Sequence, residues 1–317
     1  MQPGASPPAG GGPPVVAFGG NALLPDARDP DAAAAQAGAF AEAMLTLLSD
    51  DSGLVLVHGN GPQVGALLLQ NEAGRNEVPA SALDVLVAET QGSIGYLLSR
   101  SLHNALRARA IQVVTVVTQV VVDPADPAMA NPTKPVGPFY PETDRADLVA
   151  ERGWQVVTVA GKGVRRLVPS PLPIDVIEID AISAAAAAGR LVVAGGGGGI
   201  PVARADGGEL VGVEAVIDKD RTAALVAIRL DARSFIILTE VPHASVGFGT
   251  SDEAPILEMS IDRAQELLDE GEFPPGSMGP KVESAIAYAR ATGRPALITN
   301  VESLADALEG RNGTLVL

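Results

Sequence analysis

The stretch Leu54–Ala73, which reads LVLVHGNGPQVGALLLQNEA, decides the fold. Its opening residues, Leu54–His58, are aliphatic up to the closing histidine, which is typical of a buried strand. The turn Gly59-Asn60-Gly61 follows, and Pro62 suits the first position of a helix, where a missing N–H costs nothing. We therefore expect a strand, a glycine-rich turn and a helix over Pro62–Ala73, in that order.

The same succession recurs along the chain. Further strands are expected at Val15–Phe18, Val113–Val117, Leu191–Ala194 and Phe235–Leu238. Further helices are expected at Asp31–Leu48, Ala82–Ala108, Arg221–Arg229, Ile261–Asp269 and Pro280–Thr292. Strands that alternate with helices predict an α/β fold with a mainly parallel sheet, in which ligands bind beyond the carboxyl ends of the strands.

Two segments depart from this alternation. Residues 1–14, MQPGASPPAGGGPP, lack the means to bury apolar surface, so we expect a disordered and dispensable leader. Residues from about Asp123 to Asp175 are rich in proline, glycine and charge. An excursion of this length is either a floppy surface loop or a functional unit, and we expect a protruding, mobile subdomain that brings Lys134 over the site.

Composition narrows the range of functions. The chain has 317 residues, 47% of them hydrophobic, which is enough for one large domain or two joined subdomains. A formal net charge of -16 and an aromatic content of 3% argue against nucleic acid as a partner. The absence of cysteine excludes disulfides and thiolate ligands, and three scattered histidines disfavour a zinc site. With no signal peptide and no membrane span in the sequence, we expect a cytoplasmic protein.

Lysine is the most informative residue type. Only four of the 22 basic residues are lysines: Lys134, Lys162, Lys219 and Lys281. A compact ammonium on a flexible stem suits a phosphoryl group that moves. Surface charge is the alternative for any one of them, but all four stand in distinctive contexts, so a phosphate site is favoured. No Walker A pattern is present.

Three glycine-rich loops follow predicted strands: Gly19-Gly20-Asn21, Gly59-Asn60-Gly61 and Gly195–Gly199. Glycine lets backbone N–H groups approach an anion, and a helix start adds partial positive charge. Tight strand-to-helix turns also need glycine, so each loop alone is a weak signal. Together on one sheet edge they favour a phosphate or carboxylate cradle.

The sequence Asp218-Lys219-Asp220 is either a solvated turn or part of a site. In the second interpretation one aspartate orients lysines, and we assign this role to Asp218, while another is available to Mg²⁺. His58 closes a buried strand and is interpreted as structural.

A family resemblance rests on eight motifs. VVAFGGNAL, HGNGPQVG, LDVLVAETQGSIGY, VVTQVVVDPADPAMANPTKPVGPF, VPSPLPIDV, GGGGIPV, GVEAVIDKD and PGSMGPK stand in the order seen in carbamate kinases, a branch of the amino acid kinase family. The resemblance runs from about Val15 to the C-terminus. It implies a three-layer α/β/α sandwich around a mostly parallel sheet, a protruding subdomain at about 123–175 and a nucleotide-binding half at about 212–317.

The resemblance also implies an activity and a set of partners. Carbamoyl phosphate and ADP would be converted reversibly to ATP and carbamate, with Mg²⁺, by a homodimer that needs neither nucleic acid nor membrane. Many amino acid kinases carry a lysine two places before the first glycine pair. Carbamate kinases lack it and use a lysine of the protruding subdomain, and here the two positions are Ala17 and Lys134.

The site residues implied fall into three groups. The catalytic group is Lys134, Lys219, Lys281 and Asp218. The substrate and phosphate group is Gly19, Gly20, Asn21, Gly59, Asn60, Gly61, Gly196 and Gly197. The nucleotide group is Thr239, Ser277 and Met278, and no metal ligand is assigned.

Three positions depart from the family pattern. Lys162 stands where relatives often have arginine, Leu172 where they usually have lysine, and Pro242 where they typically have aspartate. These changes leave two alternatives open: a family member that phosphorylates another small acid or phosphonate, and a nucleotide-binding regulator without turnover. Retention of the motif lysines argues against the regulator.

Overall fold

The computed structural model describes residues 11–19, 40–48, 53–109, 111–274 and 276–317. Its centre is an eight-stranded sheet in which neighbouring strands are parallel except for β16 and β17. In spatial order the strands are β15 (Glu258–Met259), β17 (Thr314–Val316), β16 (Ala296–Thr299), β12 (Phe235–Leu238), β1 (Val15–Phe18), β2 (Leu54–His58), β9 (Leu191–Val193) and β3 (Val113–Thr115). The prediction of an α/β fold with a mostly parallel central sheet is confirmed.

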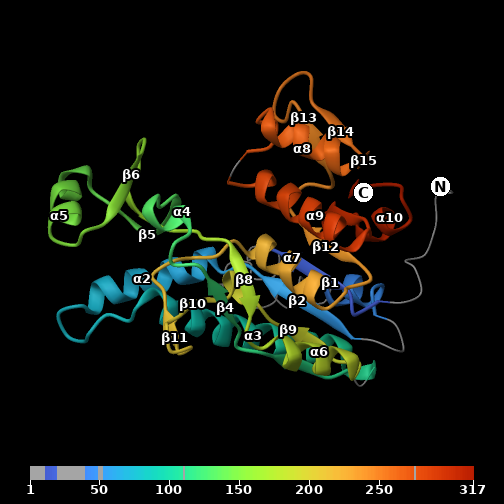
Figure 1. The fold of residues 1–317 in the computed structure, drawn as a ribbon, viewed down its shortest axis with the longest axis horizontal. Coiled ribbons are helices and arrows are strands. Elements are labelled where there is room, and N and C mark those ends of the chain that lie inside the picture. Colours follow the sequence, from blue (N-terminus) through green and yellow to red (C-terminus); the bar gives the residue numbers. More distant parts are fainter. Residues whose placement is uncertain (1–10, 20–39, 49–52, 110, 275) are drawn as a thin grey trace.

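Helices cover both faces of this sheet, because successive strand residues point to opposite sides. In β1, Val15 and Ala17 join one buried cluster, and Val16 and Phe18 join another. The first cluster is completed by α6 (Ile179–Ala187), α7 (Lys219–Arg229), α8 (Ile261–Asp269) and α9 (Met278–Thr292). The second is completed by α3 (Leu83–Leu106), helical residues 40–45 and α10 (Leu304–Leu308). The result is the predicted three-layer sandwich (Figure 1).

A second sheet extends the core beside α2 (Gly61–Gly74). Its strands are, in spatial order, β11 (Leu210–Gly212), β10 (Ile200–Arg204), β4 (Gln119–Val122) and β8 (Pro173–Val176). A third apolar cluster, which includes Val64 of α2 and Val121 of β4, joins this sheet to α2 and α3. It also includes Val136 and Val168, which belong to the small sheet described next.

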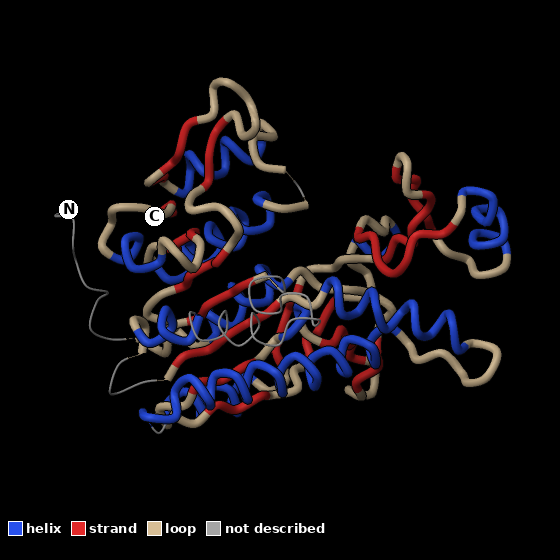
Figure 2. Tube along the Cα trace, turned by 180° about the vertical axis from the view of Figure 1, so that it is seen from behind, coloured by secondary structure: helices blue, strands red, loops and turns tan. Residues whose placement is uncertain are grey.

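A small three-stranded sheet projects from the body, as Figures 1 and 2 show from opposite sides. Its elements are α4 (Pro127–Ala130), β5 (Lys134–Tyr140), α5 (Arg145–Ala150), β6 (Gln155–Val159) and β7 (Gly163–Val168), with the strand order β5-β7-β6. We call this unit the protruding sheet. It lies within the predicted segment 123–175, whose last residues instead belong to β8. Its mobility stays a prediction.

Several sequence-based boundaries agree with the structure. The strands Val15–Phe18, Leu54–His58 and Phe235–Leu238 and the helix Ile261–Asp269 end where predicted. A hairpin of β13 (Ala244–Val246) and β14 (Ala254–Ile256), and the short 3-10 turns Arg107–Arg109, Glu142–Asp144 and Gly196–Gly198, were not predicted. Half of the helix expected at Asp31–Leu48, residues 31–39, lies outside the described residues, as do Gly20 and Asn21.

The predicted disordered leader is too long. Residues 1–10 lie outside the described residues, but Gly12 to Pro14 extend the line of β1. The Gly12 N–H donates to the Asp231 carbonyl at 2.7 Å, and Pro14 accepts from the Val55 N–H at 3.0 Å. Pro13 and Pro14 are buried. The prediction is therefore wrong for Gly12–Pro14, because their carbonyls continue the pairing of the central strands even where proline lacks an N–H.

Within the part of the chain that the structure describes, no helix combines the length and apolar character needed to cross a bilayer.

Candidate active site

A cavity of about 420 Å³ opens where β2 ends and α2 begins. The protruding sheet closes one side of it with Lys134 and Arg165, and the loop before α7 closes another with Asp218 and Lys219. The turn Gly59-Asn60-Gly61 forms the floor, together with Gly197. Segments far apart in sequence thus meet at the carboxyl edge of the sheet, where α/β folds bind ligands.

Two aspartates hold the three candidate catalytic lysines. Lys134 Nζ lies 3.0 Å from Asp218 Oδ2. Lys219 Nζ lies 2.6 Å from Asp220 Oδ1, and Lys281 Nζ lies 2.9 Å from Asp220 Oδ2. One carboxylate therefore bridges two ammonium groups, and a second ties the protruding sheet to the same cluster.

This geometry divides the role predicted for Asp218 between two aspartates. Asp218 precedes α7 and caps it, since its Oδ1 accepts from the Asp220 N–H at 3.0 Å. Only its other oxygen is left for a lysine, and that oxygen contacts Lys134. Asp220 stands one position inside the helix, faces inward with 3% of its surface exposed, and holds Lys219 and Lys281.

Burial and neighbouring charges have opposing effects on the pKa values of Lys219 and Asp220. Burial lowers the pKa of the Lys219 ammonium, and the charge of Lys281 lowers it further, while Asp220 raises it; the net direction is downward. Burial raises the pKa of the Asp220 carboxyl, but attraction and hydrogen bonds from Lys219 and Lys281 outweigh it, so its pKa falls below the ordinary value. A further anion near Lys219 would restore the preference for its charged form.

The start of α2 is suited to an anion. Asn60 lies at its N-cap but makes no side-chain cap, because its Nδ2 donates instead to Thr90 Oγ1 at 2.9 Å. The first-turn N–H groups of a helix have no partner within the helix, so they can serve a ligand. Among the described residues, none would lie within 4 Å of a Cβ placed on Gly61, or on Gly19 after β1.

The glycine run after β9 has a packing reason. A Cβ on Gly196 would lie 2.4 Å from His58 Nε2, and one on Gly197 would lie 2.2 Å from Asn60 Nδ2. The run therefore lets the third loop press against the end of β2. Gly197 still lines the cavity, so packing and binding do not exclude each other there.

Gln91 is a residue that sequence reasoning missed. Its Nε2 donates to the carbonyls of Gly196 at 2.9 Å and Thr118 at 3.2 Å, and its Oε1 accepts from the Thr118 N–H at 2.7 Å. These bonds fix the glycine run from α3. The signals available in the sequence were its place in the motif LDVLVAETQGSIGY and its polar side chain among the mostly apolar buried residues of α3.

Arg165 is the second missed residue. It lines the cavity, and its Nε donates to the Gly137 carbonyl at 3.0 Å. Its exposure to the cavity depends on the pleat of β7. Lys162 instead lies 5.6 Å from the ring centre of Phe139, and Leu172 is exposed, so two of the departures lie away from the cavity lining.

The predicted nucleotide residues lie apart from this cavity. Thr239 follows β12 and donates its N–H to the Thr299 carbonyl at 2.8 Å. Ser277 and Met278 begin α9, one turn before Lys281. Of the described residues, those that line the cavity do not include these three. Lys281, in the first turns of α9, is connected to the lysine cluster at the cavity through its ion pair with Asp220.

A metal would find few ligands supplied by the protein alone. Among the described residues no group of three or more His, Cys, Asp or Glu side chains could hold an ion. Both aspartates of the cluster are already engaged by lysines.

Comparisons with known proteins agree on one family. A model described as the amino acid kinase family matches residues 13–300. The carbamate kinase of Trichomonas vaginalis is 44% identical over 310 residues, which cover 96% of this chain and 98% of the relative. That of Thermococcus kodakarensis is 43% identical over 318 residues, with the same coverage. The structure of carbamate kinase from Giardia lamblia bound to AMP-PNP is 39% identical and superposes with a TM-score of 0.89, covering 97% of this chain and 98% of that one.

Proposed function

Because this chain belongs to the amino acid kinase family, we propose that it catalyses reversible phosphoryl transfer between ATP and carbamate. The observation that carries the proposal is the lysine cluster beside the start of α2. Lys134 and Lys219 line one cavity with Gly59-Asn60-Gly61, and Lys281 joins them through Asp220. The name of the Giardia lamblia relative, a carbamate kinase bound to AMP-PNP, supports the choice of both substrates.

The chemistry asks little covalent work of the protein. A carbamate oxygen is already anionic, so no general base is needed to attack the phosphorus atom. The protein has to hold donor and acceptor in line and stabilise charge on the transferring group. The N–H groups at the start of α2, with those around Gly19, would hold the acceptor side.

The lysines would supply the positive charge. Lys219 and Lys281 are held apart by the two oxygens of Asp220, so each presents its remaining N–H groups without having to reorganise. Lys134 rests on Asp218, and an arriving phosphoryl group would offer it a second partner. Mg²⁺, when bound with the nucleotide, would neutralise charge on the phosphates, and Asp218, which lines the cavity, is the candidate carboxylate.

The remaining parts of the proposal concern the nucleotide and the assembly. Thr239, Ser277 and Met278, at the ends of β12 and the start of α9, would contact the nucleotide on the far side of Lys281. The homodimer rests on the family resemblance, and the cytoplasmic location rests on the sequence features given above.

The test is ATP formation from ADP and carbamoyl phosphate with Mg²⁺. We expect turnover with carbamoyl phosphate well above that with acetyl phosphate. Turnover with acetyl phosphate alone would replace carbamate by another acid and overturn the assignment. Nucleotide binding without turnover of either compound would favour a regulator.

A further inference from the structure

The protruding sheet carries a second cluster of charged and aromatic side chains on the side away from the cavity. The ring of Trp154 stacks against two guanidinium groups, with Arg152 Cζ at 4.7 Å and Arg166 Cζ at 4.6 Å from its centre. Tyr140 meets the same ring edge-on, with the ring centres 6.0 Å apart. Stacked cations of this kind restrict both the ring and the guanidinium groups.

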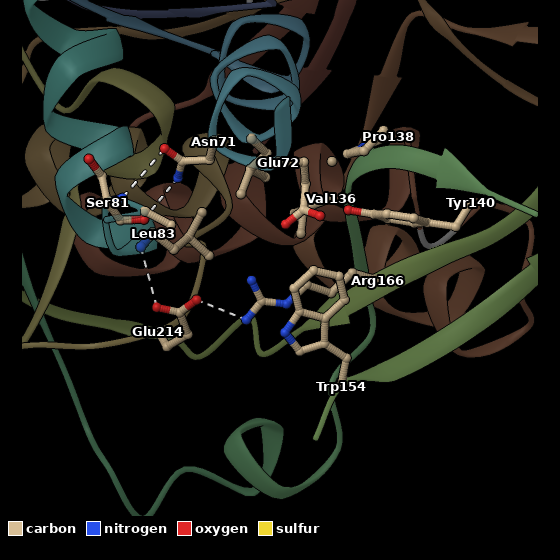
Figure 3. Close-up of a pocket in the computed structure, with 13 residues that line it drawn as sticks. Asn71, Glu72, Ser81, Leu83, Val136, Pro138, Tyr140, Trp154, Arg166 and Glu214 are labelled. Atoms are coloured by element: carbon tan, nitrogen blue, oxygen red, sulfur yellow. Dashed lines mark hydrogen bonds and ion pairs between the residues drawn. The ribbon is translucent and has the colours of Figure 1, made fainter. Parts of the chain in front are cut away.

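Each guanidinium is also paired with a carboxylate of the main body. Arg152 Nη1 lies 2.8 and 2.7 Å from the two oxygens of Glu72, on α2. Arg166 Nη2 donates to Glu214 Oε1 at 2.8 Å, and the other oxygen of Glu214 accepts from the Leu83 N–H at 3.3 Å, where α3 begins. Figure 3 shows Glu214 joining Arg166 to Leu83, with Trp154 against the guanidinium. We call Glu72, Arg152, Trp154, Arg166 and Glu214 the latch.

The latch and the cavity lie on opposite faces of one strand. Neighbouring residues of a strand point to opposite sides, and in β7 Arg165 lines the cavity while Arg166 lines a pocket of about 220 Å³ with Trp154 and Glu214. Arg166 pairs across the sheet with Val136, in the strand that begins at Lys134. Val136 lines both the cavity and the pocket. Holding Arg166 in place therefore also holds the strand that carries Lys134.

The pocket beside the latch does not itself indicate a ligand. Its two carboxylates, Glu72 and Glu214, are each engaged by an arginine of the latch. Those pairs span the protruding sheet and the body, whereas the pair Arg145–Glu142, at 2.8 Å, lies entirely within the protruding unit. The bridging pairs therefore have a positional consequence that the internal pair lacks.

We propose that the latch is a positioning element for the phosphoryl-transfer reaction: it seats the protruding sheet so that Lys134 reaches Asp218 and the acceptor cradle. This inference rests on the proposed function. Its residues do not line the cavity, so they act on the reaction through Lys134. Loosening either bridging pair lowers the fraction of molecules with Lys134 in place.

The first measurement does not depend on turnover. Trp154 is the only tryptophan of the chain, so its fluorescence reports on the latch alone. We expect Arg152→Gln to shift its emission to longer wavelength and to increase quenching by acrylamide, and Arg145→Gln to change neither. Equal emission and quenching in wild type and Arg152→Gln would overturn the latch, even if the enzyme proves not to use carbamoyl phosphate.

The second measurement separates positioning from a loss of fold. Arg152→Gln and Glu72→Gln should each lower kcat/KM for carbamoyl phosphate by about tenfold, the size expected when a partly buried ion pair and a stacked cation are lost. Arg145→Gln should leave it unchanged. In a Lys134→Met background, Arg152→Gln should cause no further loss, because the residue that it positions is gone. The same factor lost in both backgrounds would overturn the proposal, and absence of ATP formation in the wild type would instead overturn the function on which it rests.

Discussion

Asp220 Oδ2 lies 2.9 Å from Lys281 Nζ, although 61 positions separate the two residues in sequence. The contact joins the starts of α7 and α9, which pack side by side in the first apolar cluster. A cation near a helix N-terminus opposes the helix dipole, and the carboxylate of Asp220 removes that conflict for Lys281. The same carboxylate holds Lys219, so the two helices and the two ammonium groups form one structural unit.

Removing the charge of Asp220 should destabilise the fold. Asp220→Asn keeps the shape but leaves Lys219 and Lys281, both largely buried, facing each other without a counter-charge. We expect the free energy of unfolding to fall by about 3–5 kcal/mol, the range for a broken buried pair. Arg263→Ala, which removes an exposed ion pair with Glu266, should cost at most about 1 kcal/mol in the same urea titration. Equal losses in the two variants would contradict the bridging role of Asp220.

His58 should make stability depend on pH. Burial lowers its pKa to about 4, with a smaller opposing contribution from its bond to the Gly59 carbonyl. The unfolded chain, with an ordinary pKa of about 6.5, therefore binds a proton that the folded chain does not bind between these values. Acidification from pH 7 to about pH 4 should cost the wild type about 3 kcal/mol more than it costs His58→Gln. Parallel stability curves for the two proteins would show that His58 is not buried in its neutral form.

Gly197 should tolerate substitution poorly. Its φ is +68°, and a Cβ there would lie 2.2 Å from Asn60 Nδ2. Gly271 is a matched control, with φ at +79° and nothing within 4 Å of the added atom. Gly271→Ala should cost about 1 kcal/mol of backbone strain alone. Gly197→Ala should cost more and should also raise the KM for carbamoyl phosphate, because Asn60 must move; an equal effect on stability with an unchanged KM would contradict this.

The N-terminal segment should contribute to stability only from about Gly12 onward. A variant lacking residues 1–10 should unfold at the same urea concentration as the full chain, given a composition that cannot bury apolar surface. A variant lacking residues 1–14 loses the backbone bonds of Gly12 and Pro14, at about 1 kcal/mol each, and two buried prolines. Identical midpoints for the two deletions would show that Gly12–Pro14 contribute nothing.

Local patterns predicted the frame of the molecule well. The strands β1 and β12 are continuous apolar runs, and β2 is apolar up to His58, as expected for strands of a sheet that is covered on both faces. The lysines were found by their rarity, and the order of the motifs gave the family. Each of these signals can be recognised without knowing which segments meet in space.

The partners of those lysines could not be predicted in the same way. Which of Asp218 and Asp220 holds Lys281 depends on where α7 begins, because Asp218 caps the helix whereas Asp220 lies in its first turn. Gln91 and the latch join segments that only the tertiary fold brings together. The sequence alone does not show which of the two neighbouring arginines of β7 faces the cavity and which faces the latch. The docking of Gly12–Pro14 rests on backbone groups, which composition does not reveal.

The central claim is that Lys219 and Lys281 act on the transferring phosphoryl group. Lys219→Ala and Lys281→Ala should each lower kcat for ATP formation by ~10²–10³, or ~3–4 kcal/mol, because a fixed charge gains most where charge shifts in the transition state. The Kd for ADP should change far less. Lys162→Ala is the matched control, since Lys162 lies over Phe139 and away from the cavity lining, and it should have little effect. The most direct measurement is therefore kcat beside Kd for these three variants: a large loss of kcat confined to Lys219→Ala and Lys281→Ala is predicted, and wild-type turnover in both would contradict the account.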